Sequence, residues 1–335
     1  MNPVKLGIIG CGIAARELHF PALQKLNDKF KITVVCNHTE PKARSFAELA
    51  GGVPYVLNYH DLIQRVDVEA VAIVLPIHLN YQVTKDALEA GKHVIVEKPL
   101  AANLTEAKQM LTFEDRFPQV KMVAENFRYR KTFYRVKDLL DNNKIGEPYA
   151  VFWNVFYHVD KHNKYAQTKW RIHHQYPGGF ITDGGIHNIA ALRYFFGDIT
   201  SGMAFTKSVN PAIGRLDTMS LQFNMESGVD GVFNVFCSSY GYLENRIIIL
   251  GRNGSLVIEN NNIIIKKHGQ PDQTETVEDD GGYQGQFEDF YEGIRFGKPV
   301  ISSFTEAYRD FMTILKALES AEKGQIFKGN QDERN

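Results

Sequence analysis

The chain has 335 residues, which is more than a single hydrophobic core usually accommodates, so we expect two domains. Lys and Arg number 38 against 39 Asp and Glu, and this balance excludes the broad basic surface that nucleic acid or an anionic membrane requires. The three cysteines are far apart, the first residues do not read as a signal peptide, and no apolar run is long enough for a membrane helix. We therefore expect a cytoplasmic protein.

Residues 4–26 have the pattern of a buried strand, a tight turn and a helix, with the sequence G-x-G-x-x-A in the turn. Gly10 permits the tight turn, Gly12 lets the backbone approach a phosphate, and Ala15 allows close packing of the helix on the strand. Together with Ala14 at the helix N-terminus, these residues predict a site for the pyrophosphate of a dinucleotide. The alternative is a glycine-rich turn in some other α/β protein.

The second predicted strand, 31–36, ends at Asn37, where a dinucleotide site usually has an acidic residue that binds the ribose hydroxyls of NAD. Without that carboxylate, a 2′-phosphate meets no repulsion, and the next residues can donate hydrogen bonds or supply positive charge. We therefore expect NADP(H) to be favoured, with NAD(H) possible. The predicted cofactor contacts in this loop are Asn37, His38, Thr39 and Lys42. Alternatively, Asn37 binds ribose hydroxyls and the basic residues lie on an exposed helix face.

Strands and helices alternate through the remainder of the first half, which predicts a doubly wound parallel sheet. The predicted elements are helices at 59–65, 79–90 and 105–117 and strands at 70–75, 93–96 and 121–124. Ligands of such sheets bind beyond the carboxyl ends of the strands, so Pro76, Glu97 and Lys98 are expected on the cofactor side. Lys98 is held between a strand and a proline and is a catalytic candidate, although a lone lysine is more often an ordinary solvated residue.

The second half has the character of an α+β domain. An amphipathic helix at 133–142 precedes aromatic-rich or alternating runs, which predict a large, mostly antiparallel sheet that is open on one face. The predicted strands are 149–157, 203–209, 218–225, 229–238, 246–250, 255–259 and 262–267, the last two forming a hairpin. We expect a Rossmann domain at 1–125 and an α+β domain at 126–335, whose final helix, 305–323, packs back toward the Rossmann domain.

Residues 178–187 read Gly-Gly-Phe-Ile-Thr-Asp-Gly-Gly-Ile-His. In a helical continuation Asp183 and His187 are four positions apart and share one face. Histidine is well suited to passing a proton near neutral pH, and a nearby carboxylate can orient its ring or hold a substrate hydroxyl. The alternative is a capping aspartate and a buried core histidine, but the two glycine pairs imply close backbone approach and raise the functional interpretation to equal weight.

Four further side chains are candidates for weak substrate contacts: Arg128, Tyr157, Trp170 and Arg171. Aromatic residues on a sheet usually pack in a core or an interface, and surface solvation explains the arginines nearly as well. The histidines His158, His162, His173, His174 and His187 crowd one region, and a zinc site is a minor alternative there. No cysteine accompanies them, so we predict no metal.

Three motifs in this order resemble those of the Gfo/Idh/MocA oxidoreductase family: G-x-G-x-x-A at 10–15, Ala-Gly-Lys-His-Val-Ile-Val-Glu-Lys-Pro-Leu at 90–100 and G-G-x-x-x-D-x-G-x-H at 178–187. The resemblance covers nearly the whole chain and implies a Rossmann domain followed by an α+β domain whose open sheet commonly mediates oligomers. It also implies that His187 exchanges a proton with the reacting oxygen, that Asp183 positions hydroxyls, and that Lys98 supplies positive charge.

The segment after the strand at 70–75 departs from the family pattern Thr-Pro-x-x-x-His, because the corresponding Thr and His are Leu75 and Asn80. This departure puts in doubt the cofactor contacts that depend on the usual Thr and His. The residues expected near the cofactor in the middle of the chain are Leu75, Pro76, His78, Asn80, Glu97 and Lys98.

These observations predict an NAD(P)-dependent oxidoreductase that acts on a carbonyl or hydroxyl group of a sugar, polyol or similar small molecule. A homodimer or homotetramer through the C-terminal sheet is expected. Two alternatives stay open: a non-catalytic NAD(P)-binding regulator, and an NAD-dependent glycoside hydrolase of the same fold. The intact Lys98, Asp183 and His187 argue against a regulator, and release of sugar from a glycoside would favour the hydrolase.

Overall fold

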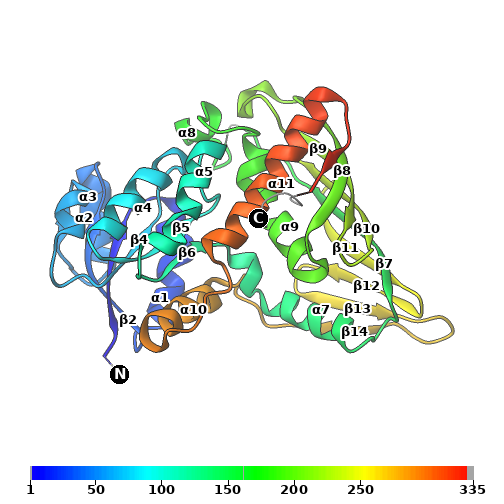
Figure 1. Ribbon diagram of the computed structural model, residues 1–335, viewed down its shortest axis with the longest axis horizontal. Helices are drawn as coiled ribbons and strands as arrows, with labels where there is room; N and C mark the ends of the chain where they lie inside the picture. The colour runs from blue at the N-terminus through cyan, green and yellow to red at the C-terminus, as the bar shows by residue number, and fades with distance from the viewer. Residues whose placement is uncertain (1, 161, 330–335) are drawn as a thin grey trace. The chain divides into compact units, whose positions relative to one another are not determined.

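The computed structural model describes residues 2–160 and 162–329, and these form two compact units (Figure 1). The first unit comprises the chain from its N-terminus to Tyr129 together with Gly282–Tyr308. The second comprises Arg130–Gly281 and the residues from Arg309 onward. This division differs from the expected 1–125 and 126–335, because the late segment 282–308 belongs to the first unit. The Rossmann unit is therefore built from two separate stretches of chain.

Six strands form one parallel sheet in the described part of the first unit, in the order β3-β2-β1-β4-β5-β6. Their bounds are β1 Val4–Ile9, β2 Phe30–Cys36, β3 Tyr55–Val56, β4 Ala70–Ile73, β5 His93–Glu97 and β6 Lys121–Ala124. The strand order reverses between β1 and β4, and folds of this class bind ligands beyond the carboxyl ends of the strands at such a point. The prediction of a doubly wound parallel sheet is confirmed.

Helices connect these strands. A π-helical turn, η1 (Ala15–His19), follows the glycine loop and continues into α1 (Phe20–Lys25). The predicted helix at 105–117 is interrupted at Thr112, where α5 ends and α6 begins. The remaining bounds in this unit are α2 Glu40–Leu49, α3 Tyr59–Ile63, η2 Ile77–Leu79, α4 Asn80–Glu89, α5 Leu104–Leu111, α6 Phe113–Arg116 and η3 Asn126–Tyr129.

Helix α10 (Tyr283–Phe296) is absent from the sequence prediction, although its apolar residues follow helical spacing. Phe287, Phe290 and Tyr291 pack against Phe30 with ring centroids 5.7, 6.4 and 5.8 Å apart. All four rings are buried. This aromatic contact is the physical reason that residues 282–308 belong to the first unit.

Nine strands form a second sheet in the described part of the second unit, in the order β14-β13-β12-β11-β7-β10-β9-β8-β15. Neighbouring strands are antiparallel except for β7 and β10, which are parallel. The bounds are β7 Pro148–Phe156, β8 Ile199–Lys207, β9 Thr218–Met225, β10 Asp230–Phe236, β11 Glu244–Gly251, β12 Gly254–Glu259, β13 Asn262–Lys266, β14 Gln273–Thr276 and β15 Phe327–Lys328. The predicted mostly antiparallel sheet and the hairpin at 255–267 are confirmed.

One face of this sheet packs on helices. Trp153 of β7 is 1% exposed, and its ring lies 5.9 Å from that of Phe133 and 6.3 Å from that of Phe233. Phe133 in turn contacts Phe195 at 5.3 Å, so helices α7 and α9 share this core (Figure 1). The helices of the unit are α7 Lys131–Asp141, α8 Lys169–Ile172, α9 Phe180–Phe196 and η4 Pro211–Ile213.

The last helix, α11 (Phe304–Lys323), begins in the first unit and continues in the second. The expectation that residues 305–323 pack back toward the Rossmann domain stays a prediction. Across the described residues, no helix combines the length and the hydropathy that crossing a membrane requires.

Candidate active site

The glycine loop has the shape that a pyrophosphate requires. Gly10 has a φ of +104°, and a Cβ at this position would lie 2.1 Å from the carbonyl oxygen of Val74, so only glycine fits. At Gly12, by contrast, open space surrounds the position of a Cβ, which leaves the backbone accessible to a ligand. Ala15 is fully buried, and the first N–H groups of the helix have no intrahelical acceptor. These residues therefore fit the group that the sequence predicts.

Asn37 connects this loop to the segment that follows β2. Its Oδ1 accepts a hydrogen bond from the backbone N–H of Cys11 at 3.2 Å, and its Nδ2 donates to the carbonyl of Thr39 at 3.3 Å. The neighbouring His38 is exposed. The hydroxyl of Thr39 and the ammonium of Lys42 have no partner among the residues that the structure describes. Two donors are thus available beside Asn37.

The carboxyl end of β5 carries Lys98, which is half-buried. The Nδ2 group of Asn80 donates to the carbonyl of Glu97 at 2.7 Å and to that of Pro99 at 2.9 Å, so it holds the backbone on both sides of the lysine. Asn80 itself is 0% exposed. Its side chain supports the turn that carries Lys98, while its Oδ1 is buried without a hydrogen-bond partner among the described residues. The predicted contact between Asn80 and the cofactor stays a prediction.

Residues Leu75, Pro76 and His78 follow β4, the strand that pairs with β5. All three are half-buried, and they come just after the same edge of the sheet at which Glu97 and Lys98 lie. Parallel strands have their carboxyl ends at one edge, so the structure brings these predicted cofactor contacts to one side of the first unit.

Helix α9 begins at Phe180, directly after two glycines with positive φ, Gly178 at +81° and Gly179 at +51°. A Cβ on Gly178 would lie 2.3 Å from the hydroxyl of Thr182, and one on Gly179 would lie 2.9 Å from Nε2 of His174. The close approach predicted for this glycine pair is therefore present. The second pair, 184–185, sits in the helix with ordinary van der Waals contacts.

Asp183 and His187 both lie on α9, one turn apart, as the sequence predicts. Asp183 is 8% exposed and His187 is half-buried. Nε of Arg171 donates to Oδ2 of Asp183 at 2.7 Å. The guanidinium of Arg171 also lies 4.0 Å from the ring centroid of Trp170, which holds its plane. Two predicted substrate contacts thus support the predicted catalytic carboxylate.

Two tyrosines lie near this carboxylate. The hydroxyl of Tyr157 is 3.0 Å from Sγ of Cys237, and burial, with additions from Cys237 and Asp183, raises the pKa of Tyr157 well above its ordinary value. Burial also raises the pKa of Tyr176, with Asp183 adding to the shift. The Tyr176 hydroxyl is buried and has no hydrogen-bond partner in the described part of the chain. Tyr176 is not among the site residues predicted from the sequence, where its only signal is its position before the glycine pair.

The remaining candidate for a substrate contact is Arg128. It belongs to η3 in the first unit, is 4% exposed, and lies 3.6 Å from Glu306. The weak contact between Arg128 and substrate stays a prediction.

The histidine cluster does not have the geometry of a metal site. The described residues contain no group of three or more His, Cys, Asp or Glu side chains that could hold a metal ion. His158 forms an isolated β-bridge with Ser238, so this residue belongs to an extended segment and not to a helix. Nδ1 of His174 lies 2.7 Å from the carbonyl of Tyr176.

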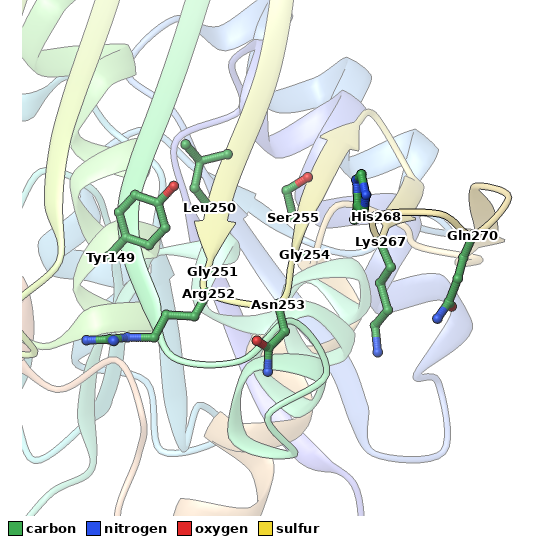
Figure 2. Close-up of a pocket in the computed structure, with 10 residues that line it drawn as sticks. All are labelled: Tyr149, Leu250, Gly251, Arg252, Asn253, Gly254, Ser255, Lys267, His268 and Gln270. Carbon is green, nitrogen blue, oxygen red and sulfur yellow. The ribbon is translucent and has the colours of Figure 1, made fainter.

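A separate cavity of about 640 Å³ lies at one end of the second sheet, lined by residues of β7, the β11–β12 turn and the segment after β13 (Figure 2). No residue of the predicted site lines it. Among its lining residues, Arg252 is exposed and pairs with Glu147 at 2.7 Å. We assign this cavity no part in the reaction.

Two sequence profiles match the chain. The profile described as "Oxidoreductase family, NAD-binding Rossmann fold" matches residues 4–125, and the profile described as "GFO/IDH/MocA C-terminal domain" matches residues 133–257. The chain belongs to the Gfo/Idh/MocA oxidoreductase family. The family resemblance seen in the sequence is confirmed, and the protein is an NAD(P)-binding oxidoreductase.

Individual proteins are similar to this chain over most of its length. Protein YMR315W of Saccharomyces cerevisiae is 32% identical over 265 residues, covering 77% of this chain and 75% of the yeast protein. Myo-inositol 2-dehydrogenase of Thermotoga maritima is 24% identical over 263 residues, covering 77% and 75%. The crystal structure of oxidoreductase TM0312 from Thermotoga maritima has a TM-score of 0.91 at 34% identity, covering 97% and 98%. Both units thus follow one family fold.

Proposed function

We propose that this protein transfers a hydride between NADP(H) and a carbonyl or hydroxyl carbon of a sugar, polyol or similar small molecule, with His187 donating or accepting the proton. The observation that carries the proposal is the pair on α9, in which the buried Asp183, held by Arg171, precedes the half-buried His187 by one helical turn. A carboxylate and an imidazole in this relation are typical of general acid–base catalysis.

A bound nicotinamide ring would supply or accept the hydride. In the direction of reduction, the imidazole of His187 gives its proton to the oxygen on which negative charge develops, and in oxidation it takes that proton back. Arg171 holds one carboxylate oxygen of Asp183, so the orientation of the carboxylate toward substrate hydroxyls is fixed. Lys98, on a turn held by Asn80, supplies positive charge that stabilises the developing alkoxide.

The preference for NADP(H) is supported by the first turn of α2. The Thr39 hydroxyl and the Lys42 ammonium have no partner among the described residues and suit a 2′-phosphate. The acidic residue of the same turn, Glu40, is bonded to Arg44 at 2.7 Å, and this bond, with one from Tyr55, lowers the pKa of Glu40. Its charge is thus compensated locally, which limits its repulsion of a phosphate.

A hydroxyl-rich substrate is supported by the side chains around Asp183. Trp170 offers a ring face, and the buried Tyr176 hydroxyl has no hydrogen-bond partner in the described chain, so it can serve a ligand. A donor left unpaired in a buried position costs about 1–3 kcal/mol, which a substrate hydroxyl would recover. The name of the myo-inositol 2-dehydrogenase relative is consistent with a polyol or sugar.

Assembly through the second sheet is supported by the face opposite α7 and α9. Strand register aligns a row of side chains across this face: Ile264, Val257, Ile248, Phe152, Val232, Gln222 and Met203. Each of them is exposed or half-buried, and Phe152 is 41% exposed. A flat, mostly apolar row of this kind is typical of a subunit interface, and we propose a homodimer or homotetramer that covers it.

The test combines cofactor binding with turnover. Purified protein is titrated with NADPH and NADH, and then supplied with C4-deuterated reduced cofactor and a panel comprising myo-inosose, D-glucose, D-xylose and 2,3-butanedione. We expect tighter binding of NADPH and transfer of deuterium to the carbonyl carbon of at least one compound. Cofactor binding without any label transfer would contradict the proposed reaction. If the protein also releases nitrophenol from p-nitrophenyl glycosides, the result would favour the glycoside hydrolase.

A further inference from the structure

His19 and Glu97 are separated by 78 residues in the sequence, but their side chains meet in the first unit. Nε2 of His19 lies 2.5 Å from Oε1 of Glu97. The His19 side chain is 2% exposed and that of Glu97 is 14% exposed. A hydrogen bond from a buried ring to a mostly buried carboxylate is among the stronger ones in proteins, because one partner is ionised and water does not compete.

Aromatic rings of α10 enclose His19. Tyr283 and Phe287 stand edge-on to its ring, with centroids 5.9 and 5.6 Å away. Nδ1 of His19 is buried and has no hydrogen-bond partner in the part of the chain that the structure describes. A proton on Nδ1 would be a buried donor without an acceptor, so the surroundings favour the tautomer in which Nε2 donates to Glu97.

His19 and Glu97 each lie at the end of a segment, and the two segments have different roles in the proposed function. His19 is the last residue of the π-helical turn η1, which follows the glycine loop, and Glu97 is the last residue of β5, directly before Lys98. In the sheet β4 separates β1 from β5, so the contact bridges the region where the strand order reverses. π-Helical turns are frequent at functional sites, because they redirect a side chain that a regular helix would place elsewhere.

We propose that His19 is a positioning residue whose hydrogen bond to Glu97 fixes the glycine loop relative to the turn that carries Lys98. The inference rests on the proposed function, since it assumes a dinucleotide whose pyrophosphate is held at the loop and whose nicotinamide half is held beyond β5. Asn80 fixes the backbone around Lys98, and His19 fixes the side chain that precedes it. The bond therefore sets the span over which both halves of the dinucleotide are held.

A purely structural role makes a different prediction. If His19 served only the aromatic core with Phe287, its loss would weaken binding of the adenine half and of the whole dinucleotide equally. If it sets the span, the adenine half alone binds as before, and only the full dinucleotide and the hydride-transfer step are affected.

The experiment measures dissociation constants of NADPH and NADH, and of the adenine-side fragments adenosine 2′,5′-bisphosphate and 5′-AMP, for the full-length protein and three variants. His19→Phe keeps an aromatic ring between Tyr283 and Phe287 but cannot donate. His19→Gln keeps a donor for Glu97. The matched control, His93→Gln, changes a histidine at the opposite end of β5, whose Nδ1 accepts from the N–H of Val120 at 2.9 Å. Melting temperatures report folding.

We expect His19→Phe to weaken dinucleotide binding about tenfold or more, with fragment binding unchanged, and His19→Gln to recover most of the loss. His93→Gln should leave all four constants unchanged. In a Glu97→Gln background, His19→Phe should add little, because the bond is already weakened. If His19→Phe does not fold, His19→Gln is compared with Glu97→Gln. We then expect weaker dinucleotide binding in Glu97→Gln and not in His19→Gln.

Equal dinucleotide affinity in wild type and in a folded His19→Phe would overturn the inference. Equal losses of affinity for the fragments and for the dinucleotides would also overturn it. The same holds if the losses of dinucleotide affinity in His19→Phe and Glu97→Gln add up in the double variant. When His19→Gln is compared with Glu97→Gln, an equally large loss of dinucleotide affinity in both variants would overturn it. A wild-type protein that binds neither dinucleotide would instead contradict the proposed function, so the two failures are distinguishable.

Discussion

Nε of Arg171 lies 2.7 Å from Oδ2 of Asp183, with both side chains nearly buried and the guanidinium stacked on Trp170. The arginine therefore orients the carboxylate from one fixed direction, and a hydrogen bond to a charged group contributes about 1.5–3 kcal/mol. The geometry depends on the planar shape of the guanidinium, which a lysine does not reproduce.

Replacing this arginine tests its role. We expect Arg171→Lys to lower kcat/KM by about 10- to 100-fold, since Asp183 loses its fixed orientation while the positive charge remains. Steady-state kinetics with the substrate found in the panel measure the effect. Arg252→Ala, which removes an exposed arginine of the same unit, should leave kcat/KM unchanged. Wild-type kinetics in Arg171→Lys would exclude an orienting role.

Cofactor choice is tested at Asn37. Asn37→Asp keeps the oxygen that accepts from Cys11 but introduces a carboxylate, so it should weaken NADPH relative to NADH by about tenfold or more. Lys42→Ala should weaken NADPH selectively, because it removes a cation that faces no protein partner in the described chain. Fluorescence titration gives the two constants for each variant. An unchanged ratio in both variants would contradict the account of cofactor preference.

Assembly is tested on the open sheet face. Phe152→Glu places a charge in the middle of the apolar row and should dissociate the oligomer, because burying an unpaired carboxylate in an interface is costly. Light scattering coupled to gel filtration gives the mass. Leu49→Glu, at an exposed position on α2, is the control and should leave the mass unchanged. A monomeric wild-type protein at all concentrations would refute the proposed interface.

His93 makes the free energy of unfolding depend on pH. Burial lowers the pKa of His93 below its usual value of 6.5. Below this usual pKa the unfolded chain binds a proton that the folded chain does not, so the free energy of unfolding falls as pH drops from 6.5 toward the lowered pKa. Denaturant unfolding at about pH 7.5 and about pH 5.5 should show a smaller fall for His93→Gln than for wild type. An equal fall in the free energy of unfolding for wild type and His93→Gln would mean that His93 does not cause this pH dependence.

Local patterns in the sequence were sufficient for the Rossmann sheet and for the pair on α9. The strand, the turn and the helix at 4–26 follow from neighbouring residues, and the turn accepts only glycine at position 10 because a Cβ there would collide with Val74. The spacing of Asp183 and His187 likewise depends only on the helix that contains them.

Relationships between distant segments were not accessible in this way. The return of α10 to the first unit depends on rings that meet Phe30 from more than 250 residues away, and the bond between His19 and Glu97 joins segments 78 residues apart. Asn80 was expected at the cofactor because of its place in the family motif, and the sequence did not show that its Nδ2 group donates to the backbone of Glu97 and Pro99. The position of an asparagine in the sequence does not reveal which groups its side-chain amide contacts.

In the proposed function, His187 handles the proton during hydride transfer. Its most direct test compares kcat and the NADPH dissociation constant of wild type and His187→Ala side by side, with His268→Ala, on the same unit, as the control. We predict that kcat falls by about 10²–10⁴ in His187→Ala while the dissociation constant stays within error, and that His268→Ala matches wild type in both. Undiminished turnover in His187→Ala would contradict the account.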